Sequence, residues 1–93
     1  MLDHFTFRMI TKRVSRLESD IEKYLRGNKK HYYELEKLKN FEDRKNNIVL
    51  QISNLAVSGV VNYQSDEVQY LNYRLCKIQS SINRASHNAI GCM

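Results

Sequence analysis

The stretch that decides the fold is FRMITKRVSRLESDIEKY, residues 7–24, in which an apolar residue recurs alternately every third and fourth position. A helix turns once every 3.6 residues, so this spacing places the apolar side chains along one face, where another helix can cover them. The stretch therefore predicts a helix that packs against helices. The apolar positions are Phe7, Ile10, Val14, Leu17, Ile21 and Tyr24.

The same spacing recurs further along the chain and extends the prediction to most of its 93 residues. Proline is absent and glycine occurs only three times, so long helices are permitted almost everywhere. The sequence therefore predicts an all-α protein with a single helical domain, residues 1–93. In phase with the first stretch stand Leu35, Leu38, Val49, Ile52 and Ala56. A later set has its own phase and comprises Val68, Leu71, Leu75, Ile78, Ile82, Ala85 and Ala89.

Two arrangements of the first half are compatible with this pattern. The apolar phase runs over polar Asn28 and His31 without a slip, and a helix begun there would place Lys29 and Lys30 at its positive end. Both points favour one helix over about residues 3–57, folded as a coiled-coil-like hairpin with a shorter helix over about 66–86 and a frayed tail over 87–93. The alternative is a three-helix bundle, broken at Gly27-Asn28, because glycine commonly ends a helix.

The connector between the two halves is predicted at residues 58–65. Gly59 is placed to end one helix, and the Ser65 hydroxyl to cap the N–H groups of the next. Val60, Val61 and Tyr63 make this loop unusually apolar, so we expect part of it to be buried against the core.

The charge distribution separates the two halves of the chain. Fifteen basic and ten acidic residues give a net charge of +5, and nearly all of them precede Leu50. A basic surface of this kind can bind phosphates, which makes a nucleic-acid-binding regulator the alternative function. The candidate contacts for that function are Lys12, Arg13, Arg16, Lys29 and Lys30.

No pattern of catalytic residues stands out in the sequence. The three histidines share no metal-ligand spacing with each other or with Cys76 and Cys92, and there is no glycine-rich phosphate loop. Cys76 is expected in or beside the core. We expect a protein that is not an enzyme, with no catalytic, metal or cofactor site. No apolar run is long enough to cross a bilayer, so a cytoplasmic protein with no membrane partner is expected.

The leading functional hypothesis is a non-enzymatic protein–protein interaction module: an adaptor, a small chaperone or an oligomerising regulator. In the hairpin, the final helix is too short to cover the N-terminal apolar stripe, so a second copy or another helical protein would cover it. A third reading is an inhibitor that occludes a larger enzyme. The predicted partner interface consists of Ile10, Val14, Leu17, Ile21, Tyr24, Tyr70 and Tyr73.

The order of a helical hairpin, an apolar connector (NLAVSGVV, residues 54–61) and a further helix resembles small all-helical chaperones and adaptors of bacterial secretion systems. The resemblance is one of architecture without a shared motif. It implies a partner-binding protein and assigns no functional residues.

Overall fold

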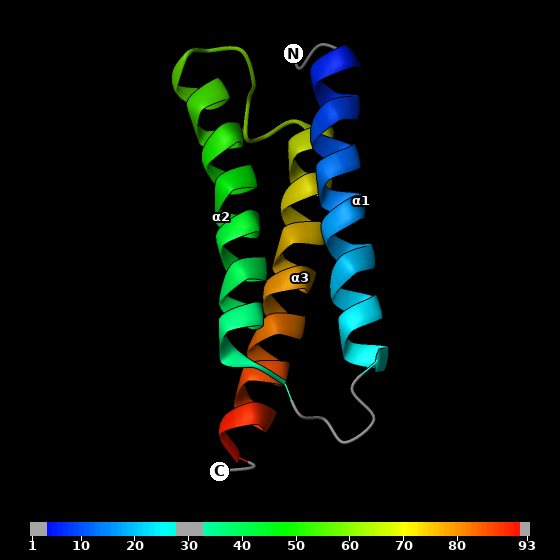
Figure 1. Ribbon diagram of the computed structural model, residues 1–93. Coiled ribbons are helices and arrows are strands. Elements are labelled where there is room, and N and C mark those ends of the chain that lie inside the picture. The colour runs from blue at the N-terminus through cyan, green and yellow to red at the C-terminus, as the bar shows by residue number, and fades with distance from the viewer. Residues whose placement is uncertain (1–3, 28–32, 92–93) are drawn as a thin grey trace.

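The computed structural model describes residues 4–27 and 33–91, which form three helices and contain no strand. Helix α1 spans His4–Gly27, α2 spans Leu35–Val57 and α3 spans Asp66–Gly91. Helices α1 and α3 run in the same direction and α2 runs antiparallel to both, in a rod of 46 × 19 × 18 Å (Figure 1). The predicted all-α class is confirmed, in its three-helix form.

The continuous helix over residues 3–57 is wrong. Helix α1 ends at Gly27, and α2 lies beside it rather than beyond it (Figure 1). The Tyr24 hydroxyl links the last turn of α1 to the residue before α2, because it accepts a hydrogen bond of 2.7 Å from the Glu34 N–H. The Tyr24 ring also contacts the rings of Tyr33 and Phe41, at centroid distances of 6.0 and 5.7 Å. Asn28 and His31, on which the phase argument depended, lie outside the described residues.

One apolar core runs the length of the bundle, and all three helices contribute to it. The N-terminal stripe is covered from within the chain, because its four central residues are 0–4% exposed and Phe7 and Tyr24 at its ends are partly buried against them. Helix α3 uses the predicted phase. The buried residues of α1 and α3 are Ile10, Val14, Leu17, Ile21, Val68, Leu71, Leu75, Ile78, Ile82 and Ala85.

Helix α2 departs from the predicted register. Leu38 and Ile52 are buried as expected, whereas Leu35 and Val49 are exposed. Ile48 takes the core position that the sequence pattern assigned to Val49, and Phe41 fills the next core position toward the N-terminus. The correction has a simple cause: α2 is apolar on two sides near residue 49, so periodicity alone does not select the buried side.

The end of α2 is a Schellman motif centred on Gly59, whose φ of +79° lies in the left-handed region. The Val60 N–H donates to the Leu55 carbonyl at 2.9 Å, and the Gly59 N–H donates to the Ala56 carbonyl at 3.1 Å. These two bonds satisfy carbonyls that the helix end would leave unpaired. Val61 is then buried under the end of the core, which confirms the expected partial burial of the connector.

Helix α3 begins at the predicted cap. The Ser65 hydroxyl accepts the Val68 N–H at 3.3 Å, and the Ser65 carbonyl accepts the Gln69 N–H at 3.0 Å. The helix continues to Gly91, five residues beyond the predicted end near Ser86. Cys76 is exposed on α3 rather than set in or beside the core.

Candidate functional site

The structure removes most of the predicted partner interface from the surface. Ile10, Val14, Leu17 and Ile21 pack against α2 and α3 of the same chain, and Tyr24 packs against this core. The first four residues are therefore out of a partner's reach and Tyr24 is only partly exposed, which corrects the prediction of an accessible stripe. The correction follows from the break after α1, because a folded-back α1 is covered by its own chain.

Tyr70 and Tyr73 remain accessible, with 49% and 62% of their surface exposed. Each lies four residues before a cation on α3 that contacts its ring. The Arg74 guanidinium carbon is 5.4 Å from the centre of the Tyr70 ring, and the Lys77 ammonium is 5.5 Å from the centre of the Tyr73 ring. We call these four residues the tyrosine face.

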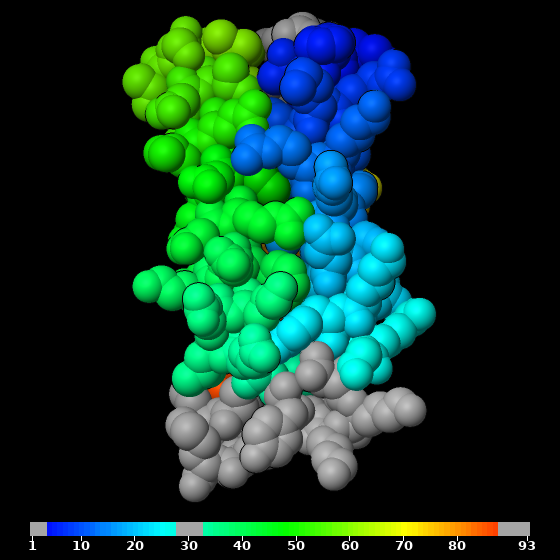
Figure 2. Space-filling view, viewed as in Figure 1, coloured from blue at the N-terminus to red at the C-terminus, as the bar shows by residue number. Residues whose placement is uncertain are grey.

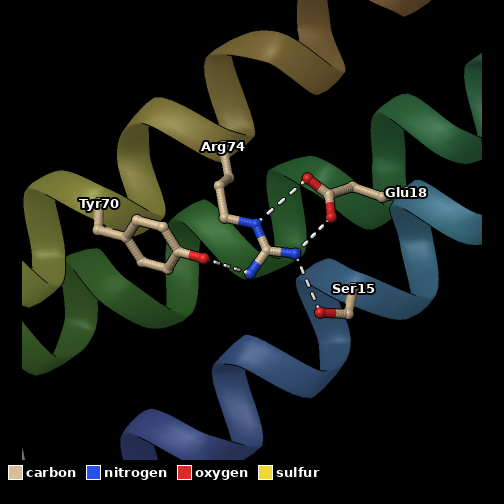
Figure 3. A network of polar contacts seen from close by, with 4 residues as sticks. All are labelled: Ser15, Glu18, Tyr70 and Arg74. Atoms are coloured by element: carbon tan, nitrogen blue, oxygen red, sulfur yellow. Dashed lines mark hydrogen bonds and ion pairs between the residues drawn. The ribbon is translucent and has the colours of Figure 1, made fainter.

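Arg74 anchors the tyrosine face to α1 (Figure 3). Its Nη2 donates to the Ser15 hydroxyl at 3.0 Å and to one Glu18 carboxylate oxygen, and its Nε donates to the other carboxylate oxygen at 3.3 Å. Its Nη1 donates to the Tyr70 hydroxyl at 3.3 Å. The hydrogen bond to the Glu18 carboxylate raises the pKa of Arg74 above its ordinary value. The network fixes one edge of the face by charge-assisted bonds to a second helix.

The predicted nucleic-acid contacts on α1 are exposed, and two of them border the groove between α1 and α2. Arg13 and Arg16 line a shallow depression of about 440 Å³ together with Arg44 of α2. In the same depression Asp20 pairs with Arg44 at 2.9 Å. Figure 2 shows α1 in blue and α2 in green meeting along this face.

Lys12 is exposed on α1 and lines a different depression, together with Phe5 and Arg8. Lys29 and Lys30 lie outside the described residues. Sequence reasoning missed Arg44, because its place beside α1 depends on the break between the two helices. It also missed Arg8, although Arg8, Lys12 and Arg16 follow one another at the spacing of a helix turn and this signal was available.

Among the described residues there is no group of three or more histidine, cysteine, aspartate or glutamate side chains that could hold a metal ion. In the same part of the chain, no helix has both the length and the apolar character needed to cross a membrane. In comparisons with known proteins, no family model, curated protein or solved structure matches this chain.

Proposed function

We propose that the protein is a non-enzymatic helical binding module, which docks a protein partner on the tyrosine face of α3. The observation that carries the proposal is the pair of exposed tyrosines, each in contact with a cation one helical turn further on. The proposal keeps the class of function that the sequence favours. It moves the contact surface from the N-terminal stripe to Tyr70 and Tyr73.

Tyrosine and arginine are the residues that most often dominate the energy of protein interfaces. A tyrosine offers a large, rigid contact area and loses little side-chain entropy when it is immobilised. Here the Tyr70 ring is held further by its contact and hydrogen bond with Arg74, which Glu18 holds in turn. A surface that is ordered before binding loses less free energy on association, which favours affinity.

The chemistry of the face specifies the kind of partner. The two rings supply apolar area, and the Lys77 ammonium lies at the surface beside Tyr73. Since Lys77 carries a positive charge, a partner with apolar side chains bordered by carboxylates is complementary to the face. A second helix presenting both kinds of residue along one side meets this requirement.

The proposal is tested by placing a photo-crosslinking phenylalanine analogue at position 73 and exposing cells of the native host to light. We expect a covalent adduct whose mass, by mass spectrometry, identifies a protein partner or a second copy of the chain. The matched control carries the analogue at Leu50, an exposed apolar residue of α2.

Adducts of equal yield at positions 73 and 50, or no adduct at 73, contradict the proposal. A second comparison guards against chance proximity and uses chains without the analogue. Tyr70→Ala with Tyr73→Ala should abolish retention of the protein that crosslinking identified as the partner. Leu50→Ala with Val57→Ala should leave its retention unchanged.

A further inference from the structure

The acidic residues of α1 are all engaged in ion pairs, whereas most of its basic residues are not. Helix α1 carries six basic and three acidic side chains. Glu18 pairs with Arg74 of α3, Asp20 with Arg44 of α2, and Glu22 with Arg26 on the same helix. Of the three cations used in this way, two come from other helices. Of the six basic residues of α1, only Arg26 is therefore paired with an acidic residue of the same helix.

The unbalanced cations form a row along the outer side of α1. Among the described residues, no ion pair involves Arg8, Lys12, Arg16 or Lys23, and all four are exposed. The first three are spaced four residues apart, which corresponds to a rise of about 6 Å per step, and the whole row covers about 22 Å. We call this set the basic row. Arg13 extends it toward the groove with α2, where its guanidinium donates to the Gln51 side-chain oxygen.

An exposed aromatic ring stands at the N-terminal end of the basic row. Phe5 is 71% exposed and, with Arg8 and Lys12, borders a second shallow depression of about 420 Å³. An uncovered phenylalanine among cations is the combination that binds single-stranded nucleic acid, in which phosphates meet cations and a base stacks on the ring.

We propose that the outer side of α1 binds a single-stranded nucleic acid without sequence preference. The basic row contacts successive phosphates, and Phe5 stacks on a base. The site is distinct from the tyrosine face and goes beyond the proposed function. A linear row of cations matches a linear polyanion, whereas a compact anion would require cations that converge on one point.

The packing of α1 disfavours an anionic membrane as the ligand. A basic amphipathic helix binds lipid by inserting its apolar face between the headgroups. In this protein that face is in the core, where Ile10, Val14 and Leu17 have no exposed surface. Among the described residues, only Phe5 and Met9 remain exposed beside the basic row for insertion into a membrane, which is far less apolar surface than a membrane-binding helix presents. A nucleic acid gains both the charge attraction and the stacking contact with Phe5.

The experiment measures binding of a fluorescent oligothymidylate by anisotropy over a series of salt concentrations. Four phosphate contacts predict that the logarithm of the affinity falls with the logarithm of the salt concentration with a slope of about −3. Lys12→Gln with Arg16→Gln should reduce the affinity at least about tenfold at low salt and make the slope shallower by about 1.4. The matched control, Lys39→Gln with Arg84→Gln, removes the same charge from exposed positions of α2 and α3 and should have little effect.

A second variant separates stacking from charge. Phe5→Ala should weaken binding about fivefold or more without changing the salt slope, because a stacked base contributes without releasing counterions. Circular dichroism verifies that every variant stays folded.

Three results would overturn the proposal. They are no binding of the oligonucleotide at about 50 mM salt, equal losses in the test and control variants, and binding to phosphatidylserine vesicles or to a DNA duplex that is tighter than binding to the single strand. Crosslinking at position 73 is independent of all three, so failure here leaves the proposed function standing.

Discussion

At the scale of single residues, Ile52 and Leu55 show how position in the same helix translates into stability. Ile52 is 2% exposed at the centre of the core, while Leu55 is half-buried and packs against it. We expect Ile52→Ala to lower the free energy of unfolding by about 2–5 kcal/mol, because the lost methyl groups leave a cavity. Leu55→Ala should cost about 1–2 kcal/mol, since less of its surface leaves water on folding.

Urea denaturation measures both values. Val57→Ala is the control, because Val57 is 89% exposed and its truncation should change stability by no more than about 0.5 kcal/mol. Equal losses for Ile52→Ala and Val57→Ala would place the core elsewhere.

The ion pair between Arg74 and Glu18 is the second prediction at this scale. A double-mutant cycle with Arg74→Met and Glu18→Gln should give a coupling free energy of about 1 kcal/mol, near the upper end for accessible pairs, because the contact uses two nitrogens and two oxygens. The pKa of Arg74 is raised in the folded protein, so its contribution is complete below the ordinary arginine pKa and is lost only at extreme alkaline pH. The coupling measured by urea denaturation should therefore be the same at neutral and mildly alkaline pH. A coupling near zero would show that the contact adds nothing to stability.

At the scale of the helices, two glycines provide a matched pair of substitutions with opposite expected signs. Gly59 has a positive φ, so Gly59→Ala forces a Cβ into the left-handed region and should cost about 1–2 kcal/mol. Gly27 is the last residue of α1, and a Cβ there would meet no atom within 4 Å beyond its chain neighbours and the backbone of its own helix. Gly27→Ala should therefore be neutral or stabilising by up to about 1 kcal/mol. Thermal unfolding compares the two variants, and a lower melting temperature for Gly27→Ala would contradict this account of the end of α1.

The helices also show which parts of the fold were accessible to sequence reasoning. The phase of α3 and its Ser65 cap are local signals, and both were predicted. The break after Gly27 was predicted only as the alternative to a continuous helix, for a geometric reason: seven residues, 28–34, separate α1 from α2, and seven residues are one full repeat of the apolar pattern. A connector of that length keeps the apolar spacing of the sequence continuous, so the pattern cannot distinguish a loop from a continuous helix.

The preference for a continuous helix also limited how much of the candidate site could be predicted. Tyr70 and Tyr73 were identified because they stand outside the apolar phase of α3. The ion pairs between α1 and the other two helices were not predicted. Arg44 contacts Asp20, and Arg74 contacts Glu18, only after α2 and α3 have folded back. Sequence spacing identifies residues that are neighbours on one helix, but it does not identify contacts between residues on different helices.

At the scale of the whole molecule, the location of the N-terminal stripe decides how the protein responds to charge. Val14→Glu with Leu17→Glu should unfold the chain, because two carboxylates would be placed where no side-chain surface is exposed. Lys12→Glu with Arg16→Glu alters the exposed side of the same helix and should leave the fold intact. Circular dichroism with sedimentation equilibrium checks both variants. A folded, monomeric Val14→Glu, Leu17→Glu variant derived from a dimeric wild type would show instead that the stripe joins two chains.

The direction of the helices has a mechanical consequence. His4 of α1 and Gly91 of α3 lie at opposite ends of the rod (Figure 1). A stretching force between them slides α1 along α3 and loads every layer of the core at once. The ends of α1 and α2 at His4 and Val57 lie together at one end, so tension between those points separates the two helices one turn at a time. The rod should therefore resist tension along its length far better than tension across that end, as single-molecule pulling from the two pairs of attachment points can measure.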